Sequence, residues 1–340
     1  MFMPGEFEPH ERCWMAWPCR SAAFGGRLTE ARRSFSNVAK SVAAFEPVIM
    51  LARPQDSVEA ASLCGPLVAI RTLPLDDSWT RDTGPVFIIN TFGDVAGVDF
   101  KFNGWGGVWP EYQNDAQLAG SIMELAGLPC YSAGIVIEGG AIHVDGQGTL
   151  MAVAPCLLDS NRNPGLMRSD LECILSANLG VTHFIWLEHG LENDETSGHI
   201  DNVACFARPG VVLANDTSDS MDGNYFGAKE NIARLRAEHD AHGNPLTVIP
   251  LEQPEFRPGK NGRLALSYVN FYLANGGLIM PSFDDPHDRN ARDILAQVFP
   301  KRRVVQIAAA DIVYGGGGIH CITLQQPLAR RHSASQTAKG

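Results

Sequence analysis

The sequence has no uninterrupted apolar run of about 18 residues, the length that a helix needs to cross a bilayer. Its opening residues, MFMPGEFEPHERCWMAWP, contain acidic residues and prolines, whereas a secretory signal peptide has a basic segment followed by an apolar one. We therefore expect no membrane partner and a cytoplasmic location.

Basic residues are in deficit, because 27 lysines and arginines stand against 38 aspartates and glutamates, a formal net charge of -11. An excess of negative charge disfavours nucleic acid and anionic membrane surfaces as partners. It suits a cationic substrate, but the solubility of an acidic protein explains the same charge. The net charge therefore argues against nucleic acid and anionic membranes as partners, but it does not by itself identify a substrate.

No pair of cysteines has the C-x-x-C spacing of a zinc site. In a reducing compartment a disulfide framework is not expected either. We therefore predict no metal, and most of the cysteines should be small buried hydrophobic side chains. The eight cysteines are Cys13, Cys19, Cys64, Cys130, Cys156, Cys173, Cys205 and Cys321.

No linker rich in proline, glycine or serine divides the chain, so residues 1–328 are expected to form a single domain. Residues 329–340, which include RRHSASQTAKG, have the composition of a disordered tail. Helical patterns are expected from Leu28 to Phe45 and from near Pro54, Asp115, Pro164, Tyr225 and Pro286. Strand-like runs alternate with them: Pro47 to Leu51, Val86 to Asn90, Ile135 to Val144, Val181 to Trp186, Gly210 to Ala214, Leu278 to Pro281 and Val304 to Ile307.

The alternation of strands and helices is typical of the α/β class. The five later helices recur at roughly 50 to 60 residues, each followed by strands, and repeats of this length can close into propeller-like rings. A repeated β-β-α-β unit is therefore predicted.

Four consecutive glycines occur in YGGGGIHCITLQQP, from Tyr314 to Pro327. A phosphate-binding loop needs a helix after its glycines and usually a Lys-Ser/Thr pair. Here β-branched and apolar residues follow, so a strand is predicted around Cys321. Glycine beside a strand can mark a place where the backbone comes close to a ligand. The candidate nucleophile after the glycines is Cys321.

Three carboxylates lie where strand patterns meet turns. Asp82, in DDSWTRDTGP, precedes the strand that starts at Val86, although taken alone it is better explained by an Asx turn. Glu138, in IEGGAIHVDGQGTL, is predicted at a strand end, whereas Asp145 belongs to the turn of a hairpin. His199 and Asp201, in DETSGHIDNVACF, are predicted on one face of a strand and could act as an acid/base imidazole and a cation-binding carboxylate.

His320 precedes Cys321, and neighbours on a strand face opposite ways, so His199 is the better partner for the thiol. A nucleophilic thiol needs a cationic neighbour to become a thiolate, and a cationic substrate could be that neighbour. One thiol, one imidazole and three carboxylates are more acid than a cysteine protease needs. The surplus carboxylates suggest a guanidinium substrate, which binds carboxylates through two parallel hydrogen bonds.

The residues above lie in a series of motifs that resembles the agmatine deiminase family, also called agmatine iminohydrolases, of the guanidine-modifying pentein superfamily. Each motif alone is weak, but their number and order cover nearly the whole chain. They run from MPGEFEPHERCWMAWP through SWTRDTGP, FNGWGG, EGGAIHVDGQGTL, NRNP, GHIDNVACF, SYVNFYLANGG and FDDP to GGGGIHCITLQQP.

The resemblance implies five β-β-α-β units about a pseudo-fivefold axis, an active site in the central channel, and no metal or organic cofactor. By match of motif, Cys321 is the nucleophile, His199 the general acid/base, Asp82 and Asp201 the carboxylates that hold the guanidinium, and Glu138 the support of the histidine. Trp79 matches a tryptophan that lines the site. We further expect Trp105, Glu195 and Gly318 to bind the substrate.

Two stretches depart from the family's usual pattern. Glu195-Thr196-Ser197 replaces Asp-Thr-Asn, and VWPEYQND replaces a version richer in tyrosine and aspartate. Both could shape the part of the channel that holds the substrate's tail. A peptidylarginine deiminase, another guanidine hydrolase and an amidinotransferase therefore stay open as alternatives to agmatine deiminase, as does a homo-oligomer.

Overall fold

The computed structural model describes residues 1–259 and 262–329. The tail prediction concerns mainly residues 330–340, which lie outside the described residues. Within residues 1–259 and 262–329, no helix combines the length and apolar character needed to span a membrane.

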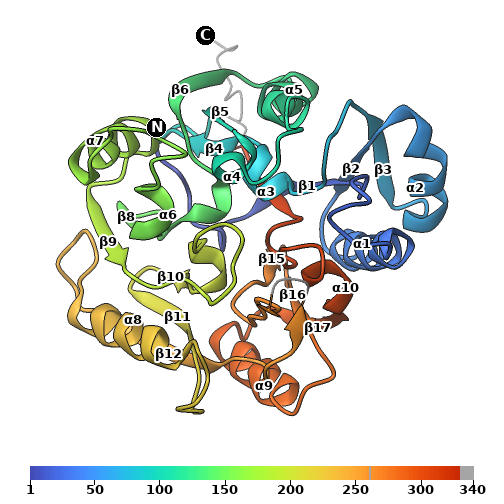
Figure 1. Ribbon diagram of the computed structural model, residues 1–340. Helices are drawn as coiled ribbons and strands as arrows, with labels where there is room; N and C mark the ends of the chain where they lie inside the picture. Colours follow the sequence, from blue (N-terminus) through green and yellow to red (C-terminus); the bar gives the residue numbers. More distant parts are fainter. Residues whose placement is uncertain (260–261, 330–340) are drawn as a thin grey trace, which may run out of the picture.

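The fold is mixed α/β, with five main sheets that lie around the middle of the molecule (Figure 1). The strands of the first three sheets are β18 (Leu324–Pro327), β1 (His10–Ala16), β2 (Val48–Ala52) and β3 (Val68–Thr72); β4 (Val86–Ile89), β5 (Val95–Lys101) and β6 (Cys130–Val136); and β7 (Ile142–Val144), β8 (Thr149–Val153) and β9 (His183–Leu187). The other two contain β10 (Ala204–Arg208), β11 (Val211–Asp216) and β12 (Thr247–Glu252); and β15 (Tyr272–Ala274), β16 (Gly277–Ser282) and β17 (Arg303–Ala308). A small hairpin joins β13 (Pro258–Gly259) to β14 (Gly262–Arg263).

Helices connect the strands within and between the sheets. The longer ones are α1 (Leu28–Ala43), α2 (Ser57–Cys64), α5 (Leu118–Ala126), α7 (Arg168–Leu179), α8 (Tyr225–Ala237) and α9 (Asp288–Val298). Four single turns are α3 (Thr80–Thr83), α4 (Gly104–Gly107), α6 (Ala154–Leu157) and α10 (Ala310–Val313).

The same connection recurs in every main sheet. Two strands pair antiparallel, a helix follows, and the next strand pairs parallel with the second, as in β4, β5, α5 and β6. In the first sheet the antiparallel partner of β1 is β18, with Trp14 opposite Leu324. Segments from both ends of the chain therefore meet in one sheet, and Cys321 lies three residues before that junction.

Apolar patterning explains how these elements pack. All five residues of β2 are buried, as expected for a strand with neighbours on both edges. In α1, Ala31, Phe35, Val38 and Val42 recur at three-to-four spacing and form the buried face of the helix. Full burial of a side chain such as Phe35 contributes about 1.5 to 3 kcal/mol, so this face fixes the helix on its sheet.

Most predicted elements agree with the structure to within a few residues. The predicted run from Ile135 to Val144 is wrong as one strand, because β6 ends at Val136 and β7 begins at Ile142. A 3-10 turn, Gly139–Ala141, separates them and places Glu138 just beyond the end of β6. The predicted hairpin at Asp145 is confirmed, since its Oδ1 accepts hydrogen bonds from the amides of Gln147 and Thr149.

The strand predicted from His199 is also wrong over its first residues. A 3-10 turn, Ile200–Asn202, precedes β10. The alternation of polar and apolar residues does not separate a buried from an exposed face here, because His199 and Asp201 are only 1% and 2% exposed. Gly198, with φ of +105°, takes the chain into this turn in a conformation that favours glycine.

The strand predicted around Cys321 is wrong for a similar reason. Residues 319–322 form turns, and β18 begins only at Leu324. The Thr323 hydroxyl donates to the carbonyl of Ile319, and its amide donates to the carbonyl of His320. The argument that His320 and Cys321 face opposite ways therefore does not apply.

Candidate active site

A cavity of about 430 Å³ of empty space, solvent at its mouth included, has Cys321 in its lining. It is lined by Trp79, Asp82, Trp105, Val108, Trp109, Glu195, Thr196, His199, Asn202, Gly315, Gly316, Gly317 and Cys321. These residues come from loops and single turns between the sheets, so the central ends of several units build one site.

Cys321 is 5% exposed and is surrounded by polar groups. Its Sγ lies 3.3 Å from the amide nitrogen of Gly318, 3.3 Å from Nδ2 of Asn270 and 3.4 Å from Oδ2 of Asp201. Burial, together with the negative charges of Asp201 and Asp82, raises the pKa of the Cys321 thiol well above its ordinary value. The thiol is therefore protonated at neutral pH unless a cation enters the site.

Different neighbours explain why the positions before Cys321 are glycine. A Cβ on Gly317 would lie 2.6 Å from the ring of Trp79 and 3.1 Å from Cβ of Cys321, so glycine there keeps the space beside the thiol open. A Cβ on Gly315 would meet Phe24, and one on Gly318 would meet Asn270. Gly317 is thus the glycine whose lack of a side chain leaves room beside the sulfur, whereas Gly315 and Gly318 make room for Phe24 and Asn270.

Asp82 lies in the single turn α3, which is attached to the Cys321 turn. The amide of Arg81 donates to the carbonyl of Cys321 at 3.1 Å. Nε1 of Trp105 donates to Oδ2 of Asp82 at 2.9 Å, and the amide of Gly140 donates to Oδ1 at 3.0 Å. These bonds fix the Asp82 carboxylate at the wall of the cavity.

Gly140 is the point at which the acidic and basic groups converge. A Cβ at this position would lie 2.6 Å from Nδ1 of His199, 2.8 Å from Oδ1 of Asp82 and 3.0 Å from Oδ2 of Asp201. Burial raises the pKa of Asp82, and the neighbouring Asp201 carboxylate raises it further, whereas the charge of His199 lowers it. Two carboxylates held this close favour a cation between them.

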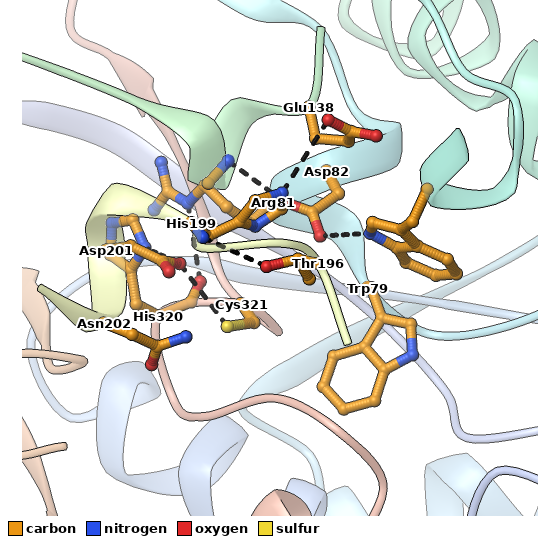
Figure 2. Close-up of polar contacts among 12 residues, drawn as sticks. Trp79, Arg81, Asp82, Glu138, Thr196, His199, Asp201, Asn202, His320 and Cys321 are labelled. Carbon is orange, nitrogen blue, oxygen red and sulfur yellow. Dashed lines mark hydrogen bonds and ion pairs between the residues drawn. The ribbon is translucent and has the colours of Figure 1, made fainter. Parts of the chain in front are cut away.

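His199 lies between two carboxylates. Its Nδ1 is 3.6 Å from Oδ1 of Asp82, and its Nε2 is 3.7 Å from Oε2 of Glu138. Burial alone would lower the pKa of His199, but Asp82, Cys156 and Glu138 raise it well above its ordinary value. The imidazole is therefore a cation at neutral pH and can donate a proton. Figure 2 shows His199 with Asp82 and Glu138.

Glu138 is fully buried and is held by a second cation. Nε of Arg162 donates to its two oxygens at 2.9 and 3.0 Å, and Nη2 of Arg162 donates to the carbonyl of Thr196 at 2.8 Å. Burial alone would raise the pKa of Glu138, but His199 and Arg162 lower it. Glu138 therefore stays ionised beside His199.

Asp201 connects the site to groups behind it. Its Oδ2 lies 2.9 Å from Nδ1 of His320, while its Oδ1 has no hydrogen-bond partner among residues 1–259 and 262–329. Nε2 of His320 lies 2.9 Å from Oε1 of Glu6. Figure 2 shows Cys321, Asp201 and His320 together.

Three of the four residues predicted to bind substrate line the cavity, and the fourth does not. Trp79, Trp105 and Glu195 line the cavity, and the ring of Trp79 is stacked on Phe24 with centroids 6.2 Å apart. Trp105 adopts φ of +56°, a left-handed conformation that is rare for a bulky residue and is typical of functional loops. Gly318 does not line the cavity, and instead its amide donates to the sulfur of Cys321.

Five further residues of the site were not identified from the sequence: Glu6, Gly140, Arg162, Asn270 and His320. All lie in motifs that carry the family resemblance, which was the available signal. They contact the predicted residues across long sequence separations, which periodicity cannot reveal.

Glu138, Cys156 and His199 could hold a metal by distance, because one ligand atom from each lies within 4.8 Å of the others. Spacing in the sequence did not predict this cluster, since the three residues come from separate segments. Arg162, however, already donates to both oxygens of Glu138. A metal would have to displace that guanidinium, so the residues present fit an ion pair better than a cation site.

Comparisons with known proteins agree with this site. The sequence profile of the Porphyromonas-type peptidyl-arginine deiminase family matches residues 2–327. An agmatine deiminase of Ectopseudomonas mendocina is 44% identical over an alignment of 350 positions, gaps included, which covers 96% of this chain and 95% of that protein. The solved agmatine deiminase of Enterococcus faecalis has a TM-score of 0.93 and 35% identity, with 96% of each chain covered.

A more distant likeness concerns the fold alone. A dimethylarginine dimethylaminohydrolase has a TM-score of 0.51 and 14% identity, with 93% of this chain and 99% of that chain covered. The profile match and the close relatives, which extend over nearly the full length, show that the chain belongs to the agmatine deiminase family of the pentein superfamily.

Proposed function

We propose that this protein hydrolyses the guanidinium group of agmatine and produces N-carbamoylputrescine and ammonia. The observation that carries the proposal is a buried thiol in a cavity that Asp82 and His199 also line, with the Asp201 carboxylate 3.4 Å from the sulfur. Relatives at 42% to 44% identity that are named agmatine deiminase support the same reaction.

Binding of the cation activates the nucleophile. A guanidinium placed between Asp82 and Asp201 donates hydrogen bonds to their oxygens and offsets the charges that keep Cys321 protonated. The thiol proton is then released to solvent, and the thiolate lies beside the electrophilic carbon. The enzyme thus forms its thiolate only when the substrate is present.

The first half of the reaction forms a covalent intermediate. The Cys321 sulfur bonds to the guanidinium carbon and gives a neutral tetrahedral adduct. The His199 imidazolium gives its proton to the leaving nitrogen, the C–N bond breaks, and ammonia departs. Glu138 holds His199 in place and stabilises its charge.

The second half releases the product. Neutral His199 takes a proton from water, and the hydroxide adds to the thiouronium carbon. The adduct collapses when the C–S bond breaks and the hydroxyl proton leaves to solvent, which gives the urea product and the Cys321 thiolate. His199 ends this half-reaction as the imidazolium from which the cycle began.

We also infer that residues 1–328 form one catalytic domain, a pentein propeller with five-fold pseudosymmetry. The repeated connection of two antiparallel strands, a helix and a parallel strand in five sheets supports it. The eight cysteines are all unpaired, which supports a reducing cytoplasmic location.

The test is ammonia release from agmatine, free arginine and an arginyl peptide without any amine acceptor. Agmatine should be the best substrate by catalytic efficiency. Ammonia release only with the peptide would assign a peptidylarginine deiminase instead. Turnover that requires an added amine would assign an amidinotransferase.

A further inference from the structure

Asp201 is linked to two further buried charged groups, His320 and Glu6, which the reaction described above does not use. Nδ1 of His320 lies 2.9 Å from Oδ2 of Asp201, the oxygen that also lies 3.4 Å from the Cys321 sulfur. Nε2 of His320 lies 2.9 and 3.0 Å from the two oxygens of Glu6. His320 is 3% exposed and Glu6 is 7% exposed, so solvent does not screen these contacts.

This geometry determines the protonation of His320. A neutral imidazole has one N–H, so its other nitrogen would face a carboxylate with a lone pair. An imidazolium donates to Asp201 and to Glu6 at once. Burial and the nearby Arg81 lower the pKa of His320, but Glu6 and Asp201 raise it above its ordinary value overall.

Glu6 is itself held firmly. Nη1 of Arg81 donates to its Oε1 at 3.1 Å, and Nε2 of His143 lies 3.7 Å from its Oε2. Its backbone carbonyl lies 2.9 Å from Nε2 of His10, at the start of β1. The segment before β1 therefore contributes a charge to the group of residues behind the nucleophile.

We propose that Glu6 and His320 are positioning residues for Asp201: Glu6 holds His320 as an imidazolium, which fixes Oδ2 of Asp201 and leaves Oδ1 to bind the guanidinium. The proposal requires that no other group occupies Oδ1, and Oδ1 has no hydrogen-bond partner in the described part of the chain. The proposal rests on the proposed function, because the cation is the agmatine guanidinium.

The pair has a consequence for pH. Burial alone would raise the pKa of Asp201, but the hydrogen bond and charge of His320, and the charge of His199, lower it. Without His320, Asp201 would be protonated at a higher pH and would lose the guanidinium there. The other titratable or charged groups near Asp201 and His320 are Glu6, Arg81, Asp82, His143, Cys205 and Cys321.

The test measures agmatine binding by calorimetry between about pH 5 and pH 8, in full-length protein in which Cys321→Ala prevents turnover. With His320→Gln added, which removes the Nδ1 donor, we expect affinity to fall at least about 10-fold more on acidification than with His320 intact. His320→Asn keeps a neutral donor toward Asp201 and should give a smaller shift. Identical pH dependence in all three proteins would overturn the proposal.

His143→Asn is the matched control, because His143 is equally buried and borders Glu6 but does not contact Asp201. Asparagine can still accept the hydrogen bond from the Phe206 amide that Nδ1 of His143 now accepts. Because His143 reaches Asp201 only through Glu6 and His320, this variant should shift the pH dependence of binding less than His320→Gln does. An equal shift in it would mean a general loss of packing, against the proposal.

A second measurement does not depend on a variant. Nitrogen NMR of the intact enzyme should show both ring nitrogens of His320 protonated at pH 7. A neutral His320 would also overturn the proposal. Ammonia release by the intact enzyme, measured separately, tests the proposed function itself, so failure of that function is distinguished from failure of the positioning role.

Discussion

The sulfur of Cys321 lies 3.4 Å from Oδ2 of Asp201, so the nucleophile of the proposed reaction is in contact with a negative charge. A carboxylate in this position favours the neutral thiol and opposes the thiolate. The arrangement keeps the free enzyme unreactive and makes the nucleophile depend on a cationic substrate.

The thiol of the free enzyme should therefore react slowly with alkylating agents. Because the pKa of Cys321 is raised, its alkylation rate should still be increasing with pH at about pH 9, above the ordinary range of a thiol. Asp201→Asn removes a charge that raises this pKa, so alkylation at about pH 8 should become faster. Mass spectrometry of the Cys321 peptide measures both rates, and a rate that levels off below about pH 8 would contradict the expectation.

Cys321→Ser should abolish ammonia release while the fold is retained. The hydroxyl is close in volume to the thiol but is a far weaker nucleophile at neutral pH. Cys173→Ser, at an exposed position of α7, is the matched control and should leave activity unchanged. Substantial turnover by a well-folded Cys321→Ser protein would exclude the covalent mechanism.

Gly140→Ala should lower catalytic efficiency by at least about 100-fold, while overpacking of this buried position lowers the free energy of unfolding by only about 1 to 3 kcal/mol. The added Cβ would displace His199, Asp82 and Asp201 from one another, and the backbone of Gly140 needs no left-handed conformation. Gly120→Ala in α5 is the control, because a Cβ there meets no atom within 4 Å. Equal kinetics for the two variants would show that the convergence at Gly140 is unimportant.

A chelator should leave activity intact. The cluster of Glu138, Cys156 and His199 is held by the Arg162 guanidinium, so a metal is not needed to balance its charge. The measurement is ammonia release after prolonged dialysis against EDTA. The same measurement on Arg162→Gln, which lacks the guanidinium, serves as a comparison. Activity that EDTA removes and a divalent metal restores would show that the cluster binds a metal.

The sequence predicted the chemical groups of the site better than their local structure. Asp82, Glu138, His199 and Cys321 could be selected because each follows or precedes a recognisable pattern. The strands predicted at His199 and at Cys321 are wrong. Alternation of polar and apolar residues predicts a strand only where the polar ones face solvent, and here the polar residues are buried as well. Motif order located the residues, whereas tight turns set their directions.

The supporting contacts could not be predicted by the same reasoning. Glu6 and His320 are 314 residues apart, and Glu138 and Arg162 are 24 apart, yet each pair is in contact. Neither pair has a periodicity that would show it. Only the return of β18 to β1 brings the first of these pairs together, and that pairing depends on the complete fold.

Substrate choice gives the last prediction: agmatine should be preferred over arginine by at least about 100-fold in catalytic efficiency, or about 2.7 kcal/mol. Arginine carries an additional carboxylate, and no lysine or arginine is among the described residues that line the cavity. Glu195 in the lining adds a negative charge. An unpaired carboxylate in this environment costs several kcal/mol.

Among the described residues, two cations near the cavity, Arg20 and Arg263, are already paired. Nε of Arg20, whose guanidinium lies over the Trp109 ring, donates to Asp77 at 3.0 Å, and Nη1 of Arg263 donates to Asp222 at 2.7 Å. Neither can turn to a substrate carboxylate without leaving its own partner. Glu195→Gln removes a negative charge from the cavity lining, so it should weaken agmatine binding and reduce the repulsion of arginine. The ratio of the two catalytic efficiencies should then be smaller than in the unmodified enzyme. Steady-state kinetics with both substrates measure the ratio, and comparable efficiencies in the unmodified enzyme would show that one of these arginines does reach the substrate.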